Sequence, residues 1–194
     1  AIATFKREDW KYITTNGREG ARPADPPSRV WPRSGQMVMR SGWEEQAHWS
    51  YFDAGPLGGW HGHYDNLHLS VAAHGRELLV DGGRYWYKGD RWREYFKGSA
   101  AHNVILVEGT GQNDSGRGTD LTEHHAIRPD FDFARAEHAA GFGAIKGVKH
   151  ARAVVYLRGL CWVVFDRLTL DQPRAIEALW HFHPDCTVQA EGQQ

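Results

Sequence analysis

The chain has 194 residues, of which 41% are hydrophobic and 24% charged, a composition typical of one globular domain. This composition excludes a disordered or collagen-like chain. A formal net charge of −1 removes the positive field on which non-specific nucleic-acid binding depends. No apolar run approaches the roughly 20 residues of a membrane-spanning helix, so none is expected.

The two cysteines, Cys161 and Cys186, are too few for a disulfide scaffold or a Cys-based zinc site. The N-terminus lacks the charged-then-apolar layout of a signal peptide. The sequence starts at Ala1 and stops soon after a strand-like run. We therefore expect an excised or processed piece of a longer protein, from which a targeting segment has been lost.

Residues 1–34 are polar and interrupted by four prolines, so they are expected to form a lead-in segment with little regular structure. From Gly35 onward the pattern changes to short apolar runs bounded by Gly, Asp, Asn or Pro, which is typical of strands. The runs that show this pattern in the first half of the chain are 36–40, 47–53, 67–73, 77–81 and 103–107.

The second half contains two β-rich runs, 151–157 and 160–166, which flank the dipeptide Arg158-Gly159 and predict a hairpin. Residues 176–183 alternate at period two and predict another strand. No capped amphipathic helix longer than about two turns is evident. The predicted fold class is all-β, an antiparallel, jelly-roll-like β-sandwich over residues 35–194.

Histidine and aspartate residues at three places suggest a metal site. In an extended segment, the side chains of His61 and His63 project from the same side, and Asp81 and His102 lie at the ends of neighbouring strands. Neutral imidazoles with one carboxylate are ligands that zinc favours. The competing interpretation is that twelve histidines produce one His-x-His by chance, or that these residues only cap turns.

The segment 84–97 interleaves five basic and two acidic residues with six aromatic ones. Aromatic rings cover the apolar faces of sugars, and guanidinium groups bind carboxylate or sulfate bidentately. Arg91, Arg93 and Trp60 are therefore candidate substrate-binding residues for an acidic sugar. The alternatives are an ordinary solvated loop with anchoring aromatics, in which Arg91 and Arg93 form surface ion pairs with Asp90 or Glu94.

Taken in order, several motifs resemble the β-sandwich domain of heparinase II/III-like polysaccharide lyases, over roughly residues 35–185. These motifs are Gly35–Gly42, His61-x-His63-x-Asp65, Leu79–Gly83, Ala101-His102-Asn103, His150-Ala151-Arg152, Trp162–Leu168 and Trp180–Pro184.

The resemblance implies β-elimination on an acidic, uronic-acid polysaccharide such as heparin, heparan sulfate or alginate. It also implies a periplasmic or secreted location and an N-terminal α/α toroid domain, which these residues do not contain. The toroid is expected either in a longer form of this protein or in a separate chain. By the same resemblance His61 faces the substrate, while His63, Asp81 and His102 hold a structural Zn²⁺. We therefore expect His61 to be catalytic, either as an acid/base or as a group that neutralises the substrate carboxylate. Tyr95 is a further candidate for proton transfer, because some alginate-type members use a tyrosine of the β domain.

Two other classes of function are considered. In a non-catalytic carbohydrate-binding or accessory β-sandwich, the aromatics and arginines would bind glycan and the metal would only fasten loops. A cupin-like metal oxygenase also carries a His-x-His, but adds a Glu four to five residues after the second His. Leu67 and His68 occupy those positions here, which disfavours the oxygenase.

Overall fold

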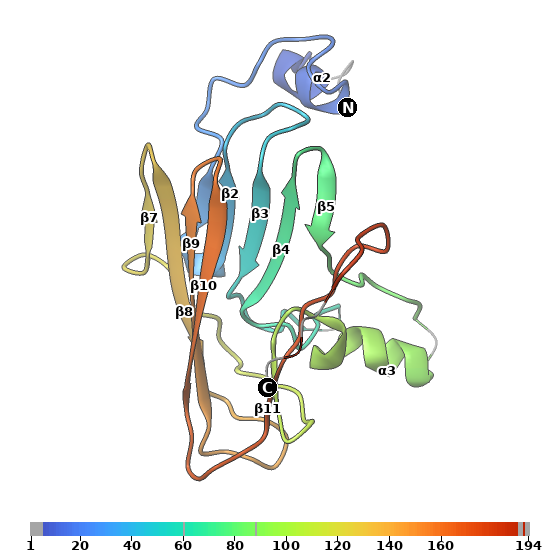
Figure 1. Ribbon diagram of the computed structural model, residues 1–194, viewed down its shortest axis with the longest axis vertical. Coiled ribbons are helices and arrows are strands. Elements are labelled where there is room, and N and C mark those ends of the chain that lie inside the picture. The colour runs from blue at the N-terminus through green and yellow to red at the C-terminus, as the bar shows by residue number, and fades with distance from the viewer. Residues whose placement is uncertain (1–5, 60, 88, 190–191, 193–194) are drawn as a thin grey trace.

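Two antiparallel sheets face each other in the computed structural model, which describes residues 6–59, 61–87, 89–189 and 192 (Figure 1). The five-stranded sheet is a simple meander of β1 (Arg29–Trp31), β2 (Gln36–Arg40), β3 (Trp49–Asp53), β4 (His68–Ala73) and β5 (Arg76–Leu79). The four-stranded sheet has the order β10 (Cys161–Thr169), β9 (Lys149–Leu157), β8 (Phe131–His138) and β7 (His125–Ile127).

Smaller elements surround the two sheets. A short ladder pairs β6 (Ile105–Val107) with β11 (Ile176–Ala178). The helical elements are α2 (Glu8–Thr14), α3 (Arg91–Lys97), and the 3₁₀ turns η1 (Pro32–Ser34) and η2 (Ser99–Ala101). Among the described residues, no helix is both long enough and apolar enough to cross a bilayer. Figure 1 shows α3 beside the lower end of the five-stranded sheet, away from α2 at its upper end.

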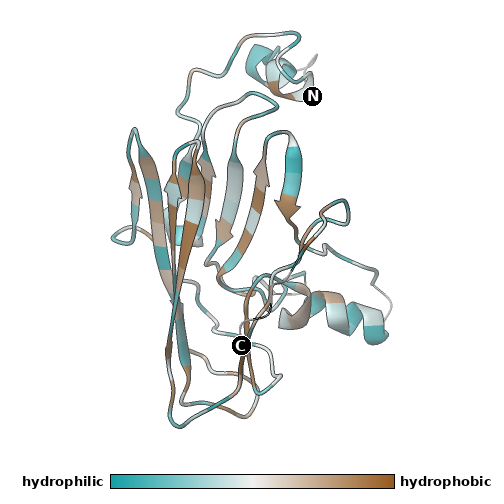
Figure 2. Ribbon diagram, viewed as in Figure 1, coloured by the Kyte–Doolittle hydropathy of each residue, from teal (hydrophilic) through white to brown (hydrophobic). Residues whose placement is uncertain are grey.

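The core lies between the two sheets because their inward-facing residues are apolar at every second position. Met37 and Met39 of β2 and Phe52 of β3 are fully buried, and they pack in one cluster with Val154 and Tyr156 of β9. Hydrophobic residues accordingly concentrate on the strands, whereas α2 and the connecting loops are largely hydrophilic (Figure 2).

The predicted fold class is confirmed, since the architecture is an antiparallel sandwich. Strand β2 has the predicted bounds, and β9 and β10 form the predicted hairpin around Gly159, whose φ of 75° suits a residue without Cβ. The sandwich begins before the expected boundary at residue 35, because β1 pairs with β2. Residues 8–14 form a helix where little regular structure was expected.

Each end of the sandwich contains an arginine–aspartate pair. Arg158 pairs with buried Asp132 at 2.6 Å and also donates to Ser28 Oγ and to the carbonyl oxygen of Arg40, which joins the second sheet to the first. Deeper along β9, Arg152 is completely buried and donates through Nε and Nη2 to the two carboxylate oxygens of Asp166, at 2.8 and 3.0 Å.

His150 completes this second cluster, with Nε2 2.6 Å from Asp166 Oδ1. Burial alone would raise the pKa of Asp166, but the hydrogen bonds from His150 and Arg152 outweigh it and lower the pKa to about 2. A carboxyl whose pKa is lower in the folded state than in the unfolded chain stabilises the fold while it is ionised.

The change Asp166→Asn is therefore expected to cost stability in a pH-dependent way. The contribution of the carboxylate is complete above the unfolded pKa of about 4 and is lost as the pH falls towards 2. Because the side chain keeps 20% of its surface exposed, we expect a pH-dependent part of about 1–2 kcal/mol. Urea denaturation of both proteins at pH 6 and pH 3 measures it, and an equal difference at both pH values would contradict the assignment.

Candidate functional site

The loop between β3 and β4 holds the two histidines of the His-x-His motif in different environments. His61 is exposed, whereas His63 is half-buried. The residue between them must be glycine, because a Cβ on Gly62 would lie 1.2 Å from the carbonyl oxygen of Leu57. The backbone N–H of Tyr64 donates to the carbonyl of Lys97 at 2.9 Å, which fixes this loop against the end of α3.

Helix α3 forms within the aromatic and basic segment because Asp90 caps it. The Asp90 carboxylate accepts the backbone N–H groups of Trp92 and Arg93, both at 3.0 Å. Gly98 ends the helix. Asp90 thus has a structural role at the start of the helix, and the helix determines the directions in which Arg91, Arg93 and Tyr95 point.

Tyr87 is the tyrosine that contacts His61. Its hydroxyl oxygen lies 3.2 Å from His61 Nδ1, and the two rings meet edge to face with centroids 5.5 Å apart. Arg84 donates a hydrogen bond to the same hydroxyl and places its guanidinium 4.3 Å from the ring centroid. A histidine and a phenol within hydrogen-bond reach of each other can exchange a proton at an exposed site.

Arg93 approaches the same place from α3, with its guanidinium carbon 5.8 Å from the Tyr87 ring centroid. It is only 8% exposed, and within the described part of the chain its Nη1 has no hydrogen-bond partner. Burying a charged guanidinium nitrogen without an acceptor costs free energy, so an anion is expected to bind near such a nitrogen. Arg91, in contrast, is exposed and lies over Trp92 at 5.1 Å.

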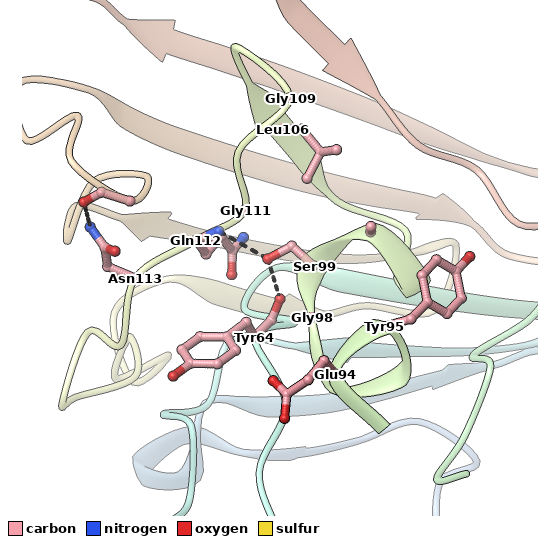
Figure 3. A pocket seen from close by; sticks show the side chains of 12 residues that line it. Tyr64, Glu94, Tyr95, Gly98, Ser99, Leu106, Gly109, Gly111, Gln112 and Asn113 are labelled. Carbon is pink, nitrogen blue, oxygen red and sulfur yellow. Dashed lines mark hydrogen bonds between the residues drawn. The ribbon is translucent and has the colours of Figure 1, made fainter. Parts of the chain in front are cut away.

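Tyr95 lines a separate pocket of about 270 Å³, which also borders on Tyr64, Glu94 and Gln112 (Figure 3). Ser99 connects two of the lining residues, since its Oγ accepts a hydrogen bond from the backbone N–H of Gln112 and donates one to the carbonyl of Tyr64. The ring of Tyr95 contacts Trp92 and Phe96. Its proposed part in proton transfer stays a prediction.

A second cluster of potential ligands lies around His102, which is completely buried. His102 Nδ1 is 2.9 Å from Asp81 Oδ2, and the rings of His102 and His63 lie 5.3 Å apart. Potential ligand atoms within 4.8 Å of one another form two groups that share His102. These groups are His63, Asp65 and His102, and His68, Asp81 and His102.

His68 does not have a free lone pair for a metal. Its Nδ1 accepts the backbone N–H of Asn103 at 3.1 Å, so its proton is on Nε2, 2.8 Å from Ser70 Oγ and 3.7 Å from Asp81. His102 differs, because its Nε2 is buried and has no partner among the described residues. The histidines that can donate a lone pair are therefore His63 and His102.

The electrostatics of this cluster suit a cation. Burial alone would raise the pKa of Asp81, but His102 and His68 outweigh it and hold this pKa well below its usual range, so Asp81 is ionised. Burial, reinforced by the charges of Asp53 and Asp81, raises the pKa of Asp65 to about 7. Burial lowers the pKa of His63, which keeps its imidazole neutral. Neutral imidazoles beside crowded carboxylates fit Zn²⁺.

The structure thus arranges the predicted residues into two neighbouring sets. His61 and Arg93 gather around Tyr87, while His63 and Asp81 each lie beside the buried His102. Among the described residues, the potential ligand atoms group His63 with Asp65 and His102, and Asp81 with His68 and His102, so His63 and Asp81 do not share one group. Trp60 lies outside the described residues. Arg84, Tyr87 and Asp65 were not predicted as site residues, although the first two belong to the aromatic and basic segment that drew attention in the sequence.

The fold and these two clusters define the class of protein: a β-sandwich domain with a His–Tyr pair among cationic groups. A family model described as "Heparinase II/III-like, C-terminal" matches residues 23–194, and the chain belongs to this family. This confirms the resemblance inferred from the sequence motifs.

Curated relatives agree with this family. The chain is 26% identical over 175 residues to a heparin-sulfate lyase of Bacteroides stercoris, covering 88% of the chain and 25% of the relative. It is 22% identical over 186 residues to a heparin-sulfate lyase of Pedobacter heparinus, covering 90% of the chain and 26% of the relative. The chain therefore spans about a quarter of the length of these relatives.

Solved structures show the same fold. A heparan sulfate lyase HepC mutant from Pedobacter heparinus superposes with a TM-score of 0.76 at 19% identity, over 95% of this chain and 28% of that chain. A structure described as Heparinase III gives a TM-score of 0.66 at 21% identity, over 85% of this chain and 26% of that chain.

Proposed function

We propose that this chain is the β-sandwich part of a polysaccharide lyase that cleaves an acidic, uronate-containing polysaccharide of the heparin or heparan sulfate type. The observation that carries the proposal is the His61–Tyr87 contact beside Arg84 and the buried Arg93, whose Nη1 has no hydrogen-bond partner among the described residues. The curated relatives are heparin-sulfate lyases, which supports this substrate class. By the same resemblance, we propose a periplasmic or secreted location.

In β-elimination, a base removes the C5 proton. The electron pair of the broken C5–H bond forms the C4–C5 double bond, while the bond from C4 to the leaving oxygen breaks and its electron pair goes to that oxygen. The leaving oxygen then takes up a proton. We assign the proton transfers at this surface to the His61–Tyr87 pair, because an imidazole and a phenol can both donate and accept protons and the two groups are in hydrogen-bond reach.

Negative charge develops on the uronate carboxylate as the C5 proton leaves, so cationic groups must face it. Arg93 provides a guanidinium for that anion, with one nitrogen that has no partner within the described residues, and Arg84 adds a second positive charge beside the Tyr87 hydroxyl. Trp86, which is 62% exposed in the same segment, offers a flat apolar face to a sugar ring. Binding and charge neutralisation are thus combined at one surface.

We further propose that His63, Asp81 and His102 hold a structural Zn²⁺. Asp81 is the carboxylate that stays ionised, and the two histidines have lone pairs for a metal. When bound, the ion would neutralise the carboxylates and fasten the loop of His63 to the segment of His102. The residues of this chain would then present His61 from a rigid loop.

The missing share of the active site is proposed to come from a larger N-terminal part, such as the α/α toroid that the family resemblance implies. The relatives are about four times as long as the region they share with this chain. The 194-residue chain alone is therefore expected to bind the polysaccharide but not to cleave it efficiently.

The lyase assignment is tested by the ultraviolet absorbance of the unsaturated uronate product, with heparan sulfate as substrate. The chain is assayed alone and fused to the N-terminal part of the Bacteroides stercoris relative, with the intact relative as positive control. In the fusion, His61→Ala and Tyr87→Phe are expected to lower the rate by about 10²-fold or more, because they remove a proton-transfer group.

The matched control is Tyr95→Phe, which is expected to change the rate by less than about threefold. A larger loss from Tyr95→Phe than from Tyr87→Phe would move proton transfer to Tyr95. If the fusion binds heparan sulfate but releases no unsaturated product, the chain is a carbohydrate-binding module instead.

The zinc assignment is tested by equilibrium dialysis followed by metal analysis of the purified chain. One zinc per chain is expected, and Asp81→Asn is expected to weaken binding at least tenfold because it removes an anionic ligand. Asp65→Asn is the matched control and should leave the dissociation constant within about threefold. The reverse order would assign Asp65 as the ligand, and no stoichiometric zinc would refute the site.

A further inference from the structure

Four residues in the later sequence motifs form a group, with His150 and Arg152 completely buried, that the proposed chemistry does not use. His150 and Arg152 come from β9, Asp166 from β10, and Trp180 from the segment after β11. Their contacts are all direct: His150 and Arg152 bind Asp166, and the Arg152 guanidinium carbon lies 4.9 Å from the Trp180 ring centroid. The charge of Arg152 is thereby neutralised inside the protein.

The remaining edge of the Arg152 guanidinium points to the first half of the chain. Its Nη1 donates to the carbonyl oxygen of Leu67 at 2.9 Å and to that of Asn103 at 2.6 Å. Leu67 ends the loop that carries His63, and Asn103 directly follows His102. One nitrogen therefore joins the two segments from which the proposed zinc ligands come.

Both carbonyl groups belong to residues whose backbone positions depend on the contacts around them. Leu67 has a φ of 74°, in the left-handed region that a side chain of this size rarely adopts. Asn103 is completely buried and links neighbouring strands, since its amide nitrogen donates to the carbonyls of Leu69 and Val80. Val80 directly precedes Asp81, so the position of Asn103 also affects the carboxylate of the cluster.

We infer that Arg152 is a positioning residue for the His63–Asp81–His102 cluster: it holds the Leu67 and Asn103 carbonyls at a fixed separation and so aligns the ligands. This role requires the guanidinium, whose planar shape binds Asp166 with one edge and both carbonyls with Nη1. A lysine ammonium is a single point and cannot span these acceptors with the same geometry.

Arg158 provides a matched control at the other end of the sandwich. It too pairs with a buried carboxylate, Asp132, and donates to backbone carbonyls, among them those of Pro129 and Arg128. None of these acceptors adjoins a residue of the His102 cluster in sequence. Loss of either arginine weakens the fold, but only loss of Arg152 is expected to disturb the cluster.

The test compares Arg152→Lys with Arg158→Lys in the full 194-residue chain. Both variants are expected to lower the melting temperature. Only Arg152→Lys is expected to raise the zinc dissociation constant, by about 10- to 100-fold, as for other residues that orient metal ligands from outside the coordination sphere. Only Arg152→Lys is expected to accelerate amide hydrogen exchange in both segments 62–68 and 99–104 of the metal-free protein.

The zinc measurement rests on the proposed function, whereas the exchange measurement does not. If the unaltered chain binds no zinc but Arg152→Lys still selectively loosens both segments, the positioning role stands and the zinc proposal fails. Unchanged exchange in the two segments, or equal acceleration by Arg158→Lys, overturns the inference. If Arg152→Lys does not fold, Asp166→Asn, which frees the opposite edge of the same guanidinium, replaces it with the same expected results.

Discussion

The burial of the Arg152 guanidinium beside Asp166 is the interaction on which the polar end of this sandwich depends. A charge with no solvent contact is tolerated only when it is paired and its donors are satisfied. Here the pairing is made within the second sheet, and the spare donors go to carbonyls of the first half of the chain. The apolar cluster between the sheets supplies cohesion, while this ion pair determines how the loops at one end are placed.

In the loop at that end, one glycine separates two histidines that have different proposed roles. Gly62 allows the backbone to pass close to Leu57, which leaves His61 exposed and His63 half-buried. The outward residue meets Tyr87 and the arginines, where an acidic sugar is proposed to bind. The inward residue lies beside His102, where the carboxyl groups of Asp65 and Asp81 favour a cation. A single loop therefore carries both His63, a proposed ligand of the structural metal, and His61, a proposed proton-transfer group.

The sequence predicted the sandwich and the β9–β10 hairpin well, because alternation and turn residues are local signals. A shared metal site of His63, Asp81 and His102 stays a prediction, since His63 and Asp81 each belong with His102 but fall into different ligand groups among the described residues. Strand β8 was missed, since the polar residues Asp132 and His138 occupy buried positions of its alternation, and Asp132 is buried because Arg158 pairs with it. Helix α3 was not predicted. It turns residues two positions apart by roughly 200°, so Arg93 and Arg91 occupy different environments. The His61–Tyr87 contact joins residues far apart in the chain, which spacing alone does not show.

The central claim is that an acidic polysaccharide binds at the surface formed by His61, Tyr87 and Arg93. It is tested most directly by nuclear magnetic resonance, with the isotope-labelled chain titrated with a heparan sulfate oligosaccharide. The account predicts saturable shifts centred on His61, on residues 84–87 and on the Arg93 side chain, which weaken as salt is added. Shifts confined to the exposed side chains of β10, with His61 and Arg93 unchanged, would contradict it.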